Sequence, residues 1–287
     1  MILLTGVTGK TGGATADVLI QQGAPLRVLV RDAAKAANIE AAGAELVVGD
    51  AADKATVQKA LEGVDSALLT LPNSEQQLGM EKQFVDCAVQ AGVGHIVKLS
   101  SMEAIPEAET PIPSLHWQSE EYIRASGLSW TMLKPNFFMQ NFLASGGSIQ
   151  QQKKFFLPMG EGKTVMIDCR DIGAVAAEVL TGDGHELQSY EITGPEMLSF
   201  SDVADRFSEV LGEKIEYVDM PADAYRERLS QFLTQEWHLN AVCDLFREVK
   251  EGATPFNVTD TFQQLMGRKP MSLVQFIRDH LSVFKAG

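Results

Sequence analysis

The chain has 287 residues, of which 45% are hydrophobic and 22% charged, and its formal net charge is -14. This composition is typical of a folded globular protein and excludes a disordered one. The length allows one large domain or two unequal ones. Because 38 Asp and Glu outnumber 24 Lys and Arg, the surface repels phosphate backbones, and we expect no nucleic acid partner.

The cysteines and the N-terminus indicate the compartment. Cys87, Cys169 and Cys243 lie far apart, and no pair has the spacing of a metal or redox site. Scattered cysteines in odd number are typical of a reducing compartment. The chain enters an apolar strand at once, so we expect no signal peptide, and no segment reaches the ~20 apolar residues of a membrane span. We therefore expect a cytoplasmic protein that binds no metal.

Short apolar runs alternate with helical patterns through the first half of the chain. Strands are expected at residues 2–5, 25–30, 44–50, 65–72, 95–101 and 128–135, and helices at 12–22, 33–42, 56–61, 76–91 and 116–127. Continuously apolar strands are buried on both faces, as in a parallel sheet covered by helices. The alternation predicts an α/β fold with a doubly wound parallel sheet, the Rossmann arrangement.

The alternation weakens after residue 135. A loop is expected at 146–156, a strand at 164–168, and helices at 171–180, 222–233, 237–249 and 272–284. We therefore predict a NAD(P)-binding Rossmann domain over 1–135. Residues 136–287 would form a smaller, mostly helical lobe that provides the substrate cleft and returns some segments to the main sheet.

The stretch "LLTGVTGKTGG" at the N-terminus joins the first strand to the first helix. Glycines there let the backbone approach a pyrophosphate, and the first N–H groups of the helix point at the anion. A glycine-rich turn without a ligand is the alternative, and the glycine spacing is too short for a Walker loop. The residues expected to hold the diphosphate are Gly6, Thr8, Gly9, Lys10, Thr11 and Gly12.

The ends of the later strands predict the rest of the dinucleotide site. Arg31 follows the second strand and suits the 2′-phosphate of NADP, whereas the adjacent Asp32 keeps NAD open as the alternative. Asp50 would lie near the adenine. The ends of the fourth and fifth strands would contact the remainder of the cofactor through Leu71, Pro72, Ser100 and Ser101.

Several motifs together resemble the NmrA-like family of atypical short-chain dehydrogenase/reductase proteins. They are "TGVTGKTGG", "VRD", "VVGD", "KLSSM", "LSWTMLKPNFFMQNF", "MIDCRDIGAVAAEVL" and "YEITGPEMLSFSDVADRFSEVLG", and they run through nearly the whole chain. The resemblance implies a Rossmann fold, a NAD(P) site and a cleft roofed by C-terminal segments. It also implies two kinds of relative: reductases of quinones, azo dyes, triphenylmethane dyes or phenylpropanoid ethers, and redox-sensing regulators.

The proton relay of most short-chain dehydrogenases is missing. None of the four tyrosines is followed four residues later by lysine, so the Tyr-x-x-x-Lys pair that serves alcohols and ketones is absent. The resemblance also implies a helix lysine in isoflavone-type reductases, and "LHWQSEEYIR" has none. Conjugated acceptors such as quinones suit this absence, because water can supply their proton.

A run of aromatic residues follows the sixth strand. We expect Phe137, Phe138, Met139 and Phe142, with Met102 from the fifth strand end, to stack the acceptor on the nicotinamide; an interdomain core is the alternative. Asn136 and Asn141 could donate hydrogen bonds to a carbonyl oxygen. His116, expected at the start of its helix, is the candidate proton donor, with a structural role as the alternative. Glu120 and Glu121 are expected on a solvated face.

Two functions are the main alternatives, beside a structural protein of the photosystem-assembly type, which shares this fold. The first is a NAD(P)H-dependent reductase of a small aromatic acceptor such as a quinone. The second is a non-catalytic NAD(P)-sensing regulator that binds a protein partner. The aromatic run favours the reductase, and the missing tyrosine and lysine keep the regulator open. The oligomeric state also stays open, with a homodimer as one alternative.

Overall fold

A computed structural model of the protein describes residues 1–252 and 256–285, and the contacts within it divide the chain into two units. The first unit contains Met1–Ala108, Pro113–Pro135 and Cys169–Glu191. The second unit contains Glu109–Ile112, Asn136–Asp168 and Ile192–Gly287. Each unit is therefore assembled from segments that are not contiguous in the chain.

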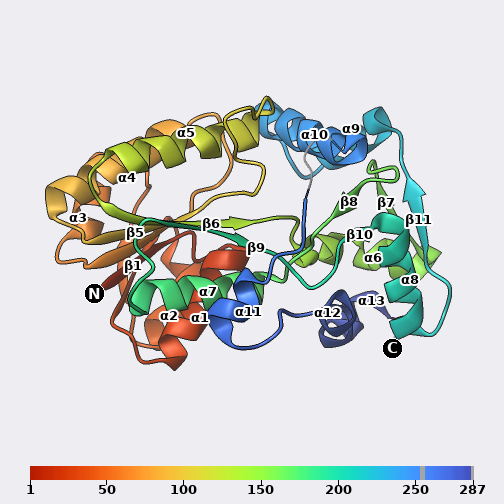
Figure 1. Ribbon diagram of the computed structural model, residues 1–287, viewed down its shortest axis with the longest axis horizontal. Helices are drawn as coiled ribbons and strands as arrows, with labels where there is room; N and C mark the ends of the chain where they lie inside the picture. The colour runs from red at the N-terminus through yellow and green to blue at the C-terminus, as the bar shows by residue number, and fades with distance from the viewer. Residues whose placement is uncertain (253–255, 286–287) are drawn as a thin grey trace. The chain divides into compact units, whose positions relative to one another are not determined.

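The first unit is built on a seven-stranded sheet with the order β3-β2-β1-β4-β5-β6-β9 (Figure 1). Neighbours among the first six strands are parallel; for example, Ile2 of β1 lies opposite Leu26 of β2 and Ser66 of β4. The doubly wound α/β prediction is confirmed. The strands are β1 (Ile2–Thr5), β2 (Leu26–Val30), β3 (Glu45–Val48), β4 (Ser66–Leu69), β5 (His95–Leu99), β6 (Ser129–Pro135) and β9 (Gln188–Ile192).

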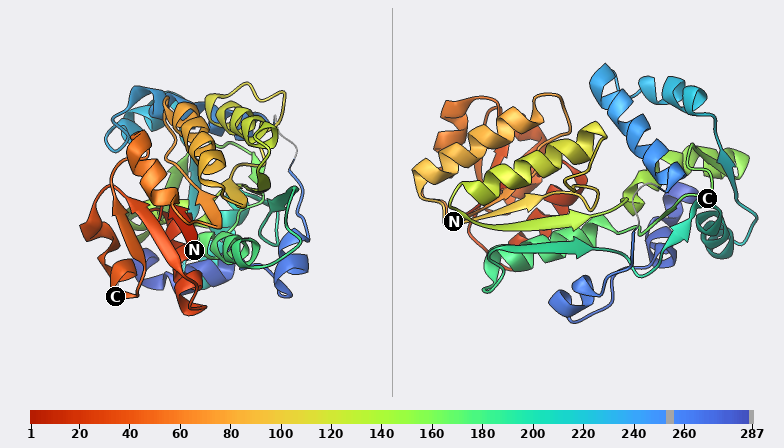
Figure 2. Two further views of the ribbon diagram at one scale, coloured as in Figure 1. Left: turned by 90° about the vertical axis from the view of Figure 1, so that its left-hand side faces the viewer. Right: turned by 45° about the horizontal axis from the view of Figure 1, so that its top comes forward.

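Helices cover both faces of this sheet. Helices α3 (Lys54–Leu61), α4 (Gln77–Ala91) and α5 (Pro111–Ala125) lie on one face, and α1 (Lys10–Gln21), α2 (Ala37–Ala41) and α7 (Cys169–Thr181) lie on the other (Figures 1 and 2). A short 3-10 helix, η1 (Ala33–Ala36), precedes α2. Because both faces are covered, all four residues of β1 and of β4 are buried, which explains why three of the four in each strand are apolar.

The second unit has two sheets of two strands each and is rich in helices. It pairs β8 (Lys163–Thr164) antiparallel with β10 (Leu198–Ser199), and β7 (Lys154–Leu157) parallel with β11 (Glu216–Asp219). Its helices are η2 (Met139–Ser145), α6 (Gly146–Gln152), α8 (Phe200–Leu211), α9 (Ala222–Ser230), α10 (Glu236–Glu251), α11 (Thr261–Met266), α12 (Leu273–Asp279) and α13 (Leu281–Phe284). Within the described residues, no helix is long and apolar enough to cross a membrane.

Several expected boundaries are wrong. The loop expected at 146–156 contains α6 and β7, and the strand expected at 164–168 is reduced to the end of β8. The last expected helix breaks at His280 into α12 and α13. Helix α5 begins at Pro111 instead of residue 116, since proline fits a first helical position where its missing N–H is not needed.

Candidate dinucleotide site and a buried charge cluster

The strand order reverses between β1 and β4, and this is where open α/β sheets bind ligands, beyond the carboxyl ends of the strands. The Thr5 hydroxyl joins these two ends: it donates to the carbonyl oxygens of Leu68 at 3.1 Å and Thr70 at 3.0 Å. It also accepts a hydrogen bond from the Thr70 N–H at 2.8 Å. The two strand ends are therefore held together at the switch point.

The loop after β1 requires glycine at two positions. Gly6 has a φ of +69°, and a Cβ there would lie 2.7 Å from the Thr70 carbonyl oxygen. A Cβ on Gly12 would lie 2.3 Å from the Gly6 carbonyl oxygen. The first turn of α1 is therefore packed directly on the loop, which only glycine permits.

The N-terminus of α1 is open to an anion. Gly9 is the N-cap residue, no side chain of the described residues caps the helix there, and its first turn carries no acidic residue. The N–H groups of this turn thus lack intrahelical acceptors and carry the positive end of the helix dipole. The Thr11 hydroxyl is buried and has no hydrogen-bond partner among the described residues, and the same holds for Thr70. These unsatisfied donors fit a diphosphate.

The strands β2 and β3 are followed by two acidic residues that stabilise turns and by one cationic residue. The Asp32 carboxylate caps η1 by accepting from the Ala34 N–H at 3.0 Å. Asp50 accepts from the Ala52 N–H at 2.9 Å. Arg31 is exposed and forms no ion pair with any residue that the structure describes. Contact of Arg31 or Asp32 with a ribose substituent stays a prediction.

Four charged side chains that the sequence patterns did not single out as a site are buried on the α4 and α5 side of the sheet. The ammonium of Lys98, in β5, lies 2.9 Å from Glu81 Oε1 of α4, and the two side chains are 1% and 0% exposed. Lys134, in β6, lies 3.4 Å from Glu120 Oε1 of α5 and donates to the Ala104 carbonyl oxygen at 2.7 Å. Each lysine lies among apolar neighbours near the end of its strand, in "IVKL" and "MLKP", and that was the signal available in the sequence.

His116 belongs to this cluster. Its Nδ1 lies 3.1 Å from Lys98 Nζ, and its side chain sits in the second turn of α5, not at the helix start. Burial lowers the pKa of His116 well below its ordinary value, and the positive charges of Lys98 and Lys134 lower it further. His116 is therefore a neutral imidazole at pH 7.

Glu120 has three partners, so the expectation of a solvated face is wrong for this residue, which is 0% exposed. Arg124 donates to its Oε2 at 2.7 Å, and the Ser100 hydroxyl donates to its Oε1. The Ser101 hydroxyl donates to Glu103. Contact with the cofactor stays a prediction for Ser100 and Ser101, and for Leu71 and Pro72 at the neighbouring strand end.

The aromatic run after β6 packs within the second unit. Phe142 and Met139 are each 1% exposed in its hydrophobic core. The half-buried Phe137 ring lies 5.6 Å from that of Phe142, and Phe138 is half-buried and pairs with Ile167. These side chains therefore stabilise a hydrophobic core of their own unit. Their contact with an acceptor stays a prediction.

The polar and sulfur-containing candidates near this run also have structural contacts. The side-chain oxygen of Asn136 accepts a hydrogen bond from the Val165 N–H at 3.3 Å. The buried Met102 donates its N–H to the Pro135 carbonyl oxygen at 3.0 Å, which extends the pairing of the two strand ends. A role toward an acceptor likewise stays a prediction for Asn136, Asn141 and Met102.

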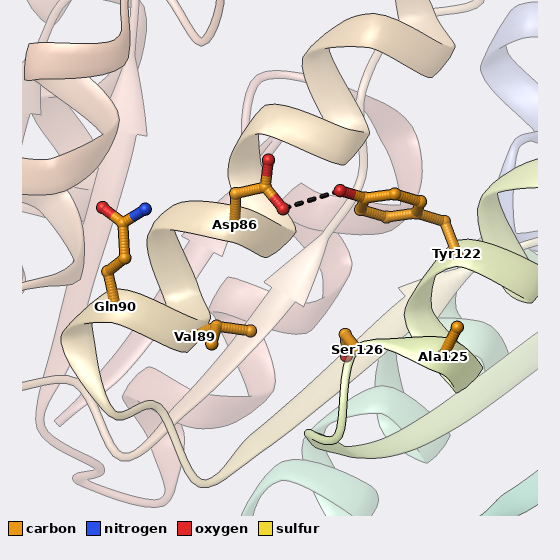
Figure 3. Close-up of a pocket in the computed structure, with 6 residues that line it drawn as sticks. All are labelled: Asp86, Val89, Gln90, Tyr122, Ala125 and Ser126. Atoms are coloured by element: carbon orange, nitrogen blue, oxygen red, sulfur yellow. Dashed lines mark hydrogen bonds between the residues drawn. The ribbon is translucent and has the colours of Figure 1, made fainter.

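A separate shallow pocket of about 310 Å³ lies between the C-terminal halves of α4 and α5 (Figure 3). The Tyr122 hydroxyl donates to Asp86 Oδ1 at 2.7 Å across it, and this hydrogen bond raises the pKa of Tyr122. Helices that follow parallel strands run back along them, so these helix ends lie at the opposite edge of the sheet from the glycine loop. The pocket is therefore not the dinucleotide site.

Comparison with known proteins identifies the family. The model of the NmrA-like family matches residues 1–274, so the chain belongs to this family and the resemblance seen in the motifs is confirmed. The chain is 34% identical to a NAD(P)H azoreductase of Xenophilus azovorans, with 100% of both chains covered. It is 25% identical to quinone oxidoreductase 2 of Escherichia coli, with 96% of this chain and 97% of that protein covered.

A solved structure supports the fold. The NADPH complex of the NADPH-dependent quinone oxidoreductase of Escherichia coli matches with a TM-score of 0.86 at 24% identity. The match covers 98% of this chain and 100% of that one.

Proposed function

We propose that this member of the NmrA-like family is a NAD(P)H-dependent reductase that prefers NADPH and reduces conjugated acceptors of the quinone or azo class. The observation that carries the proposal is the open N-terminus of α1, where the buried Thr11 hydroxyl has no partner among the described residues beside the glycine loop. The azoreductase and quinone oxidoreductase relatives support the reaction class.

The first unit holds the cofactor through its backbone. The N–H groups at the start of α1 and the hydroxyls of Thr8 and Thr11 would bind the diphosphate, and Arg31 would bind the 2′-phosphate by a forked pair of hydrogen bonds. NADPH, when bound, supplies a hydride, and one proton from water completes the two-electron reduction of a quinone to a hydroquinone or of an azo group to a hydrazo group.

The residues near the switch point suit acceptors that need no strong acid. His116 is neutral at pH 7, so it can donate a hydrogen bond but is not an imidazolium that delivers a proton. Together with the missing Tyr-x-x-x-Lys pair, this favours acceptors whose developing charge is delocalised over a conjugated system. A simple ketone would instead leave a localised alkoxide, for which this chain has no proton relay of the usual kind.

The test is an assay of NADPH oxidation by the purified protein at pH 7. A benzoquinone and an azo dye should be reduced, and cyclohexanone should react at least about 100-fold more slowly, since a relay proton is worth roughly that factor. Rapid ketone turnover would refute the choice of acceptor. Tight NADPH binding with no turnover of any acceptor would refute the reductase and support the NAD(P)-sensing regulator.

A further inference from the structure

We infer that Lys98 is a positioning residue that fixes the proton of His116 on Nε2, so that the imidazole keeps one N–H donor available to a ligand. The role of this N–H in a reaction rests on the proposed function. The position of the proton on the imidazole does not depend on that function.

The hydrogen bonds of Lys98 determine the tautomer. An ammonium has three donors and no acceptor. Lys98 Nζ donates to Glu81 Oε1 at 2.9 Å and to the Leu99 carbonyl oxygen at 2.7 Å, and it lies 3.1 Å from His116 Nδ1. The third donor therefore meets Nδ1, which must be the bare nitrogen. In a neutral imidazole the proton is then on Nε2.

Glu81 holds the Lys98 side chain in place. Its Oε1 accepts from Lys98 and from the Gln77 amide at 3.1 Å, so the carboxylate is oriented from its own helix. Removing either partner of such a buried pair leaves an uncompensated charge, which is strongly unfavourable. The ammonium is thus anchored on its far side, and the contact to His116 is held in one geometry.

The other charges that face His116 favour the same neutral state. Lys134 from β6 adds a second positive charge, and Glu120 on α5 is already occupied by Lys134, Arg124 and Ser100. Glu81 from α4 is occupied by Lys98. Within the part of the chain that the structure describes, Nε2 has no hydrogen-bond partner. One donor of the imidazole is therefore left for a ligand.

A neutral Nε2–H donor has a definite consequence for the reaction. It stabilises negative charge as it develops on the acceptor oxygen or nitrogen, without a change in its own protonation. The rate should then be flat between about pH 6 and 8, because the pKa of His116 lies well below its ordinary value and the imidazole stays neutral. An imidazolium acid would instead lose activity as the pH rises through this range.

The experiment combines spectroscopy and kinetics. Long-range ¹H–¹⁵N correlation spectra of protein labelled with ¹⁵N-histidine report which ring nitrogen carries the proton, and the His116→Gln variant identifies the His116 signals. We expect Nδ1 bare and Nε2 protonated at pH 7 in the wild-type protein. Protonation at Nδ1, or an imidazolium, would overturn the inference.

The double variant Lys98→Met/Glu81→Gln tests the role of Lys98 without leaving an unpaired charge. We expect a mixture of tautomers, a fall in kcat of about tenfold with KM for NADPH within about twofold, and a new pH dependence below pH 7. Lys82→Met is the matched control, since Lys82 lies next to Glu81 on α4 but contacts the Tyr122 ring, and it should change none of these.

The outcomes separate the two proposals. An unchanged tautomer and unchanged kcat in the double variant would overturn the role of Lys98. The wild-type spectrum decides the tautomer even if the double variant does not fold. If the spectrum shows Nε2 protonated but the protein reduces no acceptor, the proposed function is refuted and the assignment of the imidazole still holds.

Discussion

Replacing Gly12 with alanine tests the close approach between α1 and the glycine loop. The added Cβ would lie 2.3 Å from the Gly6 carbonyl oxygen, 2.6 Å from the Gly6 carbonyl carbon and 2.9 Å from the Val7 nitrogen. All three neighbours are backbone atoms, so no side chain can rotate away. The loop and the helix must separate by about 1 Å to restore ordinary contact.

The magnitude follows from this separation. Overpacking of a well-packed site costs about 1–3 kcal/mol of the free energy of unfolding. A shift of about 1 Å also breaks any hydrogen bond from the loop amides to a phosphate, and each such bond to a charged group contributes about 1.5–3 kcal/mol. Losing one of them raises the Kd for NADPH by at least about tenfold.

Isothermal titration calorimetry with NADPH and urea unfolding of the cofactor-free protein measure the two effects. Gly79→Ala is the control, because a Cβ at this position of α4 meets nothing within 4 Å. It should bind NADPH as the wild type does and unfold at equal or higher urea concentration. A Gly12→Ala protein with wild-type stability and a Kd within twofold would refute the reasoning.

Four further predictions concern other parts of the molecule. Arg31→Ala should raise the Kd for NADPH at least about tenfold and that for NADH less than twofold, by calorimetry; equal losses would remove Arg31 from 2′-phosphate recognition. Thr11→Val should leave the cofactor-free protein equally or more stable in urea, because a buried unpartnered hydroxyl is removed, yet weaken NADPH binding. The pKa of His116 is lowered in the folded protein, so below about pH 6.5 the unfolded chain binds a proton that the folded protein does not. The free energy of unfolding should therefore fall as the pH drops from 7 to 5, by up to about 1.4 kcal/mol per pH unit from this group. His116→Gln should show a shallower fall. Phe142→Ala should lower the free energy of unfolding by about 3–5 kcal/mol in urea titrations, and a loss below about 1 kcal/mol would contradict its place in the core of the second unit.

The parts of the fold that could be predicted from the sequence depend on local patterns. The strands of the main sheet are short apolar runs, and the loop after β1 carries its glycines within a few residues of each other. The second unit was harder to predict, because β7 pairs in parallel with β11, about sixty residues further along the chain. Neither strand has a pattern that reveals its partner.

The buried charge cluster could not be predicted for a similar reason. Lys98 and Glu81 lie on different elements, and only the packing of α4 on the sheet brings them together. The side of α5 that carries Glu120 is buried by β6 and its lysine, so adjacent glutamates on one helix have opposite surroundings. A helical pattern gives the angle between Glu120 and Glu121, but not which of them faces the sheet.

The close contact between α1 and α7 bears on how the protein folds during synthesis. A Cβ on Gly173 would lie 2.6 Å from the backbone of Ala14, and the Ser66 hydroxyl donates to the Leu180 carbonyl oxygen. The segment that covers one side of the first helix is therefore translated only after more than thirty residues of the other unit. A nascent chain that ends at residue 135 would expose this apolar helix face on the ribosome, and the nucleotide-binding unit can be completed only once α7 has emerged.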